Sequence, residues 1–168
     1  MSFRTENKFI LPVNKNFEFK NWLIKNKYST LFKKRYVNSV YFDTKNFMIY
    51  KDSIEGTTPR KKIRIRTYSN KFLKDNNEFN LEIKISSIEG RYKKKEKIKK
   101  EINKLLNGIY DYQYGRCFPV LNVIYEREYF IKNHSRITID TNIKYFVIKG
   151  KFISSHCQKE SCFVVENK

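Results

Sequence analysis

The chain has few of the residues that interrupt regular structure. Its 168 residues include only 5 glycines and 3 prolines, against 12 tyrosines and 14 phenylalanines. Aromatic and β-branched side chains favour strands, and a chain rich in them is not of the disordered class. We therefore expect one ordered, mainly β domain that buries its core without disulfides.

Cysteine is also scarce, and long apolar runs are missing. The odd count of 3 cysteines fits neither a disulfide framework nor a zinc pattern, so both classes are disfavoured. No apolar segment reaches the length of a transmembrane helix, and no signal-peptide core follows Met1. The sequence predicts a soluble protein of the reducing cytoplasm.

Acidic residues are outnumbered. The 36 Lys and Arg face 17 Asp and Glu, which gives a net charge of +19. Such a surplus predicts a polyanionic partner, whether nucleic acid, a phosphate chain or a membrane surface.

Strand-like alternation of charged and apolar residues is the main pattern that is present. In RKKIRIRTY (60–68), Lys62, Arg64 and Arg66 share one face of a strand, and Ile63 and Ile65 share the other. Taken alone, the charged face is typical of a solvated surface. The design recurs, however, in SFRTENKFIL (2–11), FNLEIKI (79–85), PVLNVIYEREYFI (119–131), SRITID (135–140) and CFVVENK (162–168).

Helical spacing is predicted at two places. Phe19, Trp22 and Leu23 lie at i, i+3 and i+4 after Pro12, and apolar residues at i, i+4, i+7 and i+8 predict one amphipathic helix over 92–106 with a basic, solvated outer face. Further elements are expected as a strand at 37–44, a short helix or turn at 47–50 and a strand at 144–153.

The charged faces can be brought together by closing the sheet. Three strands carry Glu and Lys two residues apart on one face: Glu6 with Lys8, Glu82 with Lys84, and Glu166 with Lys168. About eight antiparallel strands closed into a barrel would turn such faces inward around a ligand, with helices covering the apolar outside.

A lumen of this kind would be strongly cationic. Like charges about 6 Å apart repel by roughly 3 kcal/mol at an effective dielectric near 20. A triphosphate or longer phosphate chain would relieve the repulsion, with Arg binding bidentately and Lys acting as a point charge. The glutamates fit beside phosphate when Mg²⁺ or Mn²⁺ bridges carboxylate and phosphate oxygens.

The order of motifs resembles the VTC (vacuolar transporter chaperone) domain of the triphosphate tunnel metalloenzymes, relatives of the CYTH proteins. The resemblance rests on RTENKF, YFDT, RKKIRIRTY, LEIK, YEREYF, RITIDT and VVENK, which run over nearly the whole chain. It implies a mainly β (α+β) domain over 1–168, an eight-stranded antiparallel β-barrel tunnel with flanking helices. It also implies ATP, tripolyphosphate or polyphosphate as ligand, Mn²⁺ or Mg²⁺ as cofactor, no specific nucleic acid, and a membrane protein as a partner.

The resemblance also implies roles for individual residues. The catalytic set is Arg64, Arg66, Lys84, Arg127, Arg136 and Glu166. The substrate-binding set is Lys8, Lys62, Arg64, Arg66, Lys84, Tyr125, Arg127, Arg136 and Lys168. Glu166 is the first choice as metal ligand, followed by Glu6 and Glu82.

The sequence departs from the family at two positions. Arg4 stands where CYTH enzymes have the first glutamate of their Glu-x-Glu-x-Lys motif, which points to the VTC branch. The chain ends at Lys168, before the helix that carries lysines to the tunnel mouth in VTC polymerases, so we expect a domain without it.

Three functions follow from these residues. The first is phosphoryl transfer, of the polyphosphate polymerase or triphosphatase type, and it requires no nucleophilic side chain. The second is a polyphosphate or nucleotide sensor without turnover. The third is a basic barrel that stacks nucleic acid on Tyr and Phe, which leaves the Glu-x-Lys pairs unexplained.

Overall fold

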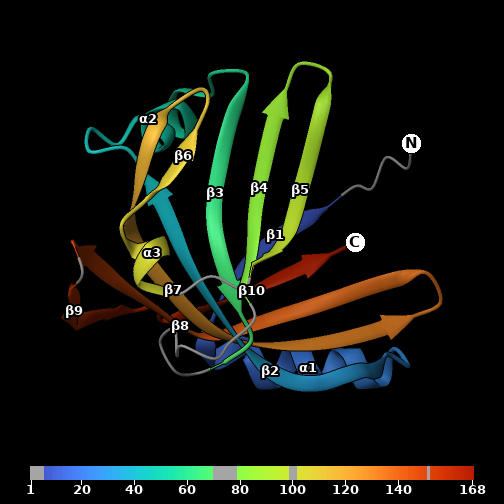
Figure 1. Ribbon diagram of the computed structural model, residues 1–168. Coiled ribbons are helices and arrows are strands. Elements are labelled where there is room, and N and C mark those ends of the chain that lie inside the picture. Colours follow the sequence, from blue (N-terminus) through green and yellow to red (C-terminus); the bar gives the residue numbers. More distant parts are fainter. Residues whose placement is uncertain (1–5, 70–78, 99–101, 151) are drawn as a thin grey trace. The chain divides into compact units, whose positions relative to one another are not determined.

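The computed structural model describes residues 6–69, 79–98, 102–150 and 152–168 and is dominated by antiparallel strands (Figure 1). The strands are β1 (Asn7–Pro12), β2 (Ser29–Asp43), β3 (Arg60–Thr67), β4 (Phe79–Ser87), β5 (Gly90–Ile98), β6 (Ile109–Asp111), β7 (Gly115–Lys132), β8 (Ser135–Lys149), β9 (Phe152–Lys159) and β10 (Cys162–Asn167). The helices are α1 (Asn16–Lys25), α2 (Met48–Glu55) and α3 (Ile102–Leu106), with a 3₁₀ turn, η1 (Val13–Lys15). The predicted mainly β class is confirmed.

The strands of the described residues form one ten-stranded sheet in the order β1-β10-β8-β7-β2-β3-β4-β5, with β6 paired to β7 and β9 to β8. This path begins at β1 and ends at β5, and among the described residues it includes no pairing between these two strands. Closure of the path into a tunnel stays a prediction. No helix in the described ranges is long and apolar enough to cross a membrane.

Two compact units divide the chain. Unit 1 comprises Met1–Val37, Ile124–Lys144 and Gln158–Lys168, and unit 2 comprises Asn38–Val123 and Tyr145–Cys157. The strands β2, β7, β8 and β9 each contribute residues to both units. The expectation of a single domain over 1–168 stays a prediction.

Unit 1 is built on a core between α1 and the sheet. Leu23, the fully buried residue of α1, packs with Ile137 and Ile139 of β8 and with Phe163 and Val165 of β10. The predicted helix after Pro12 is therefore confirmed, and burial of its apolar stripe is what stabilises so short a helix.

Unit 2 has its own core on the apolar face of β3. Ile63 and Ile65 are each 1% exposed and pack with Val40 and Phe42 of β2 and with Phe79 of β4. The predicted alternation along 60–68 is confirmed, because the isoleucines enter this core while the cations take the other face of the strand.

The predicted helix over 92–106 is wrong for its first half. Residues 90–98 form β5, which pairs with β4 from Ser87↔Gly90 to Phe79↔Ile98, and only 102–106 is helical. Gly90, at φ +144°, lets the chain turn back into the hairpin. Ile98, which fitted the helical spacing, is instead the last residue of strand β5. Pairing with β4 outweighs the local helical periodicity.

The segments predicted as separate strands at 135–140 and 144–153 belong mostly to one strand, β8. Asn142 lies within this strand with φ 54°, so a left-handed residue interrupts the alternation there. The strand at 37–44 begins earlier, at Ser29, and the predicted helix or turn at 47–50 is α2.

Candidate phosphate-binding clusters

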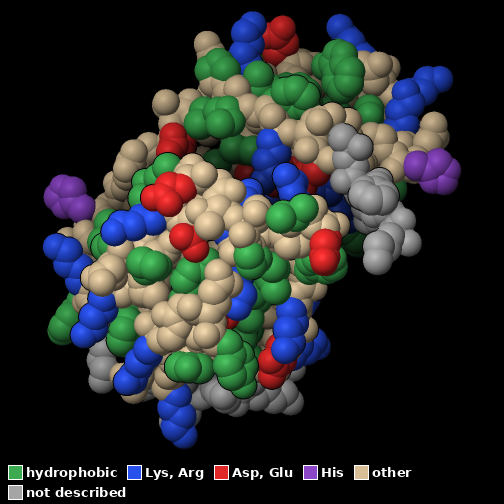
Figure 2. All heavy atoms as spheres, turned by 90° about the horizontal axis from the view of Figure 1, so that it is seen from above, with side chains coloured by type: hydrophobic (Ala, Val, Ile, Leu, Met, Phe, Trp, Pro, Cys, Tyr) green, Lys and Arg blue, Asp and Glu red, His purple; other side chains and the backbone are tan. Residues whose placement is uncertain are grey.

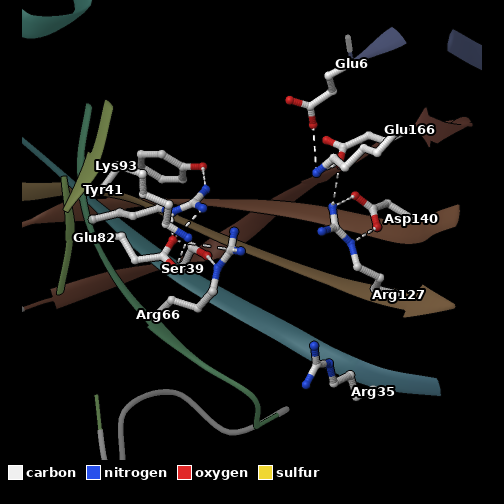
Figure 3. Close-up of polar contacts among 12 residues, drawn as sticks. Glu6, Arg35, Ser39, Tyr41, Arg66, Glu82, Lys93, Arg127, Asp140 and Glu166 are labelled. Carbon is white, nitrogen blue, oxygen red and sulfur yellow. Dashed lines mark hydrogen bonds and ion pairs between the residues drawn. The ribbon is translucent and has the colours of Figure 1, made fainter. Parts of the chain in front are cut away.

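Unit 2 holds a cluster of charged side chains around Glu82. We define the Glu82 cluster as Arg64, Arg66, Glu82 and Lys93, from β3, β4 and β5 (Figure 3). Arg64 donates from Nε and Nη2 to Glu82 Oε2 at 2.8 and 2.6 Å, and Lys93 Nζ donates to Oε1 at 2.7 Å. Arg66 Nη1 lies 4.0 Å from Oε2. Three cations therefore share one carboxylate.

Neighbouring hydroxyls fix the two guanidinium groups. Arg64 Nη1 donates to the Tyr41 hydroxyl at 3.0 Å, and Arg66 Nε donates to Ser39 Oγ at 3.0 Å. Both partners come from β2, opposite the arginines in register. Arg64 and Arg66 are thus held in one orientation from two sides, which lowers the entropy cost of gripping an anion.

Electrostatics keep Glu82 ionised. Its burial, at 2% exposure, would raise the pKa, but Lys93, Arg64 and Arg66 outweigh burial and lower the pKa to about 2. The pKa of Arg64 is raised by Tyr41 and Glu82 against the opposing effect of burial. Glu82 is therefore ionised at neutral pH.

More cations lie on the same face of this part of the sheet. Residues directly opposite each other in an antiparallel pair point to the same face. The register Lys62↔Lys84↔Lys93 therefore places three ammonium groups side by side, and Arg64↔Glu82↔Lys95 places Lys95 on this face too. Within β3, β4 and β5 the face carries one carboxylate and these cations: Arg60, Lys62, Arg64, Arg66, Lys84, Arg91, Lys93, Lys95 and Lys97.

Unit 1 holds a second cluster, around Glu166 on β10 (Figure 3). We define the Glu166 cluster as Glu6, Lys8, Arg127, Asp140, Glu166 and Lys168. Glu166 Oε1 accepts from Lys8 Nζ at 2.8 Å, and Oε2 lies 3.1 Å from Lys168 Nζ and 3.7 Å from Arg127 Nη2. Lys168 Nζ also lies 2.8 Å from Glu6 Oε1. Lys8 belongs to β1, Arg127 to β7, Asp140 to β8 and Glu166 to β10, while Glu6 directly precedes β1 and Lys168 directly follows β10.

Arg127 is fixed by a bidentate carboxylate. Its Nε and Nη2 donate to Asp140 Oδ1 and Oδ2, both at 2.5 Å, and its guanidinium lies 5.3 Å from the centre of the Tyr125 ring. Burial would lower the pKa of Arg127, but Asp140, Tyr125 and Glu166 raise it. Burial would likewise raise the pKa of Glu166, yet Lys8, Arg127 and Lys168 lower it to about 2.

The sequence matches the VTC domain family over residues 3–116, more than half of the chain. The chain belongs to the VTC domain family. The resemblance seen in the motifs is thereby confirmed. No characterised protein matched the chain in a comparison with curated sequences.

Solved structures share the fold of this VTC domain. A candidate adenylate cyclase from Bacillus halodurans matches with a TM-score of 0.58 and 13% sequence identity, covering 96% of this chain and 78% of that one. Another from Vibrio parahaemolyticus matches with a TM-score of 0.56 and 13% identity over 99% and 76%. A candidate adenylyl cyclase from Hippeastrum with a dominant triphosphatase activity matches with a TM-score of 0.52 and 14% identity over 96% and 77%.

The remaining predicted residues can also be placed. Lys62 and Lys84 are exposed on the face of the Glu82 cluster. Arg136 exchanges backbone hydrogen bonds with Lys168, so both side chains share one face of unit 1, and Tyr125 lies beside Arg127. Arg4 lies outside the described residues.

Sequence reasoning missed four members of these arrangements. Lys93 falls in the segment predicted as a solvated helix, because the run of lysines around it shows no strand-like alternation. Asp140 ends the alternating segment SRITID (135–140), but no role was predicted for it. The hydroxyls of Ser39 and Tyr41 carry no pattern of their own, and the register of β2 against β3 is what brings them to the arginines.

The Glu166 cluster fits a hard divalent cation better than the Glu82 cluster does. Glu6 and Glu166 each lie about 3 Å from the same ammonium, Lys168 Nζ, at 2.8 and 3.1 Å, so two carboxylates converge on one cationic position. The Glu82 cluster contains a single carboxylate, so no second carboxylate converges there on a shared cationic position. Within the described ranges no three His, Cys, Asp or Glu gather as a metal site, so phosphate oxygens would have to complete the coordination, as Mg²⁺ commonly allows.

Proposed function

We propose that this VTC domain binds a triphosphate group, in ATP, tripolyphosphate or polyphosphate, and catalyses metal-dependent phosphoryl transfer. The observation that carries the proposal is the organisation of the Glu82 and Glu166 clusters. In the Glu82 cluster three cations share one carboxylate, and in the Glu166 cluster Lys8, Arg127 and Lys168 converge on Glu166. Fixed partners orient the arginines of both clusters.

The charge surplus supports an anionic ligand. Arg64, Arg66 and Lys93 together carry three positive charges against the single charge of Glu82, and Lys62 and Lys84 add two more on the same face. A phosphate chain neutralises this surplus, and an arginine held by Tyr41 or Ser39 offers its remaining N–H groups to phosphate oxygens.

A buried hydroxyl group on the same face as Glu166 also supports an anionic ligand. Thr138 lies opposite Glu166 in register, is 2% exposed, and its hydroxyl finds no hydrogen-bond partner in the part of the chain that the structure describes. A buried hydroxyl without a partner costs stability, and a phosphate oxygen or its water would satisfy it.

A divalent cation, Mg²⁺ or Mn²⁺, would be held by Glu166 and Glu6, and when bound it neutralises charge on the transferring phosphoryl group. Glu166 is suited to this role because its lowered pKa keeps it ionised. Lys8 and Lys168, which contact the same carboxylate, would bind phosphate oxygens next to it. Glu82 stays a weaker candidate.

The chain's own contribution to transfer is positioning and charge stabilisation. Arg127, oriented by Asp140, would stabilise negative charge that develops on the phosphoryl oxygens. His134 and His156 are exposed, and we assign neither of them a role as a base. The attacking group would be water or a phosphate chain end.

A binding module without turnover is the second candidate. It is favoured by the contacts of Glu166, whose two oxygens already bind Lys8 and Lys168 and would have to exchange a cation for a metal. The cytoplasmic location and a membrane-protein partner stay predictions.

The test compares Glu166→Gln with Glu89→Gln, which removes an exposed carboxylate at the β4–β5 turn. Phosphate or ADP release from ATP and tripolyphosphate is measured with Mn²⁺ or Mg²⁺, and ligand binding by calorimetry. We expect Glu166→Gln to lose turnover and keep anion binding, while Glu89→Gln keeps both. Wild-type binding without turnover would support the binding module, and absence of both would refute the proposal.

A further inference from the structure

Unit 1 contains a pocket of about 350 Å³ that the proposed function does not use. Its polar lining comes from Tyr36, Glu126, Asn142, Lys144, Lys159 and Glu160. All of these residues belong to unit 1. The volume lies at the lower end of the range for small-molecule sites.

Three consecutive residues of β7 line the pocket, Ile124, Tyr125 and Glu126, so both faces of the strand contribute to it. Glu126 and Arg127 are consecutive in the strand and point to opposite faces. Lys20 of α1 binds Glu128, which shares the face of Glu126, so this is the face that α1 covers. Tyr125 borders both the pocket and Arg127.

One wall of the pocket is neutral in net charge. Glu126 pairs with Lys34 and also accepts hydrogen bonds from Asn142 and Tyr36. Burial would raise the pKa of Glu126, but Lys34 and these donors lower it. Asn142 adopts φ 54°, a conformation that is costly for a residue other than glycine, and this places its amide against Glu126.

The other wall carries surplus positive charge. Among the described residues, the ammonium groups of Lys144 and Lys159 have no carboxylate within 4.0 Å and no other polar partner. Glu160, the remaining carboxylate of the pocket, accepts a weak hydrogen bond from Cys162 Sγ at 3.7 Å. Two uncommitted cations thus face the cavity with one carboxylate.

We propose that this pocket is a second anion site, which binds a phosphate monoester through Lys144 and Lys159. A phosphate dianion matches the charge of two ammonium groups, and Lys binds phosphate as a point charge without the bidentate geometry of Arg. The cavity of about 350 Å³ leaves room beyond a phosphate for a small organic group beside Tyr36. The site is independent of the proposed function.

The test measures binding of inorganic phosphate and glycerol phosphate while saturating tripolyphosphate occupies any site of higher affinity. Calorimetry gives the affinity, and backbone amide shifts in nuclear magnetic resonance spectra give the position. We expect shifts centred on Lys144 and Glu160, and glycerol phosphate should bind more tightly than inorganic phosphate.

Variants that remove opposite charges, and so should change binding in opposite directions, make the test specific. The double variant Lys144→Gln, Lys159→Gln should bind at least tenfold more weakly, whereas Glu160→Gln should bind severalfold more tightly because it removes a like charge. Lys25→Gln, an exposed lysine of α1, is the matched control and should not change binding. If the double variant unfolds, the gain expected of Glu160→Gln still decides.

The proposal is overturned if no binding survives saturating tripolyphosphate, if the shifted amides lie elsewhere, or if both charge variants bind like wild type. None of these results bears on turnover, which the Glu166→Gln comparison tests separately.

Discussion

Replacing Glu82 by Gln tests how far the Glu82 cluster depends on its carboxylate. The pKa of Glu82 is lowered from 4.5 to about 2, and the residue is 2% exposed. A lowering of this size corresponds to about 3 kcal/mol in favour of the folded state at neutral pH. Glu82→Gln forfeits that interaction and leaves Arg64, Arg66 and Lys93 facing one another, so we expect the free energy of unfolding to fall by about 3 kcal/mol or slightly more.

The pH dependence of the stability difference tests the sign of the contribution from Glu82. Because the folded pKa lies below the unfolded one, the contribution of Glu82 is complete above about pH 4.5 and is lost as the pH falls toward 2. The difference between wild type and Glu82→Gln should therefore be largest at pH 7, about half as large near pH 3, and close to zero near pH 2. Urea unfolding across this range measures it, with Glu89→Gln as the exposed control.

Ligand binding should reverse the loss. At about a hundred times its dissociation constant, tripolyphosphate should add ~2.7 kcal/mol to the wild type. It should add more to Glu82→Gln, because the ligand no longer competes with a carboxylate for the same cations. A variant as stable as wild type at pH 7, or a difference that does not shrink on acidification, would refute this account of Glu82.

Two further predictions concern the other unit. Arg127→Lys keeps the charge but loses the two-pronged contact with Asp140, so we expect tripolyphosphate affinity to fall about tenfold; calorimetry that finds it unchanged would remove Arg127 from the site. Leu23→Ala should lower the free energy of unfolding by roughly 2 to 5 kcal/mol, since Leu23 of α1 is fully buried against the sheet. A loss below about 1 kcal/mol in urea unfolding would mean that α1 contributes little to the core.

The strands were predictable where alternation and burial agree. Ile63 and Ile65 alternate with arginines, and a period of two leaves no other way to bury both isoleucines. The helix α1 could be predicted equally well from the sequence, because its apolar residues have helical spacing and no strand-like pattern lies at its end. In these segments local pattern and tertiary packing favour the same structure.

The segment 90–98 shows where such reasoning fails. Its run of lysines has strong helical propensity, and Ile98 fits a helical stripe with residues further on. What decides is the partner strand: β4 offers a complete set of backbone groups, and a short turn at Gly90 brings β5 to them. Such pairing depends on residues outside the segment, so no local pattern reports it, and Lys93 was lost from the predicted site for this reason.

Which cations belong to the clusters could be learned only from the three-dimensional structure. On the face drawn in Figure 2, Lys and Arg side chains are scattered widely over the surface, so basic composition alone does not separate binding residues from solvated ones. Burial and fixed partners make the distinction. Arg64 and Arg66 are 9% and 8% exposed and bind Glu82, Tyr41 or Ser39, whereas Lys25, Lys51 and Lys94 are exposed.

The carboxylates of the two clusters reconcile folding with binding. Cations gathered without any anion would repel one another by about 3 kcal/mol for each pair 6 Å apart, which a domain of ordinary stability does not tolerate. Full neutralisation would remove the attraction for phosphate. Glu82 contacts three cations, which leaves a surplus of positive charge that the empty protein tolerates and that still favours a polyanion. Around Glu166, three cations match three carboxylates, so a ligand would have to exchange with an existing ion pair. The glutamates are therefore structural in the free chain, and under the proposed function they would give up these cations when a ligand binds.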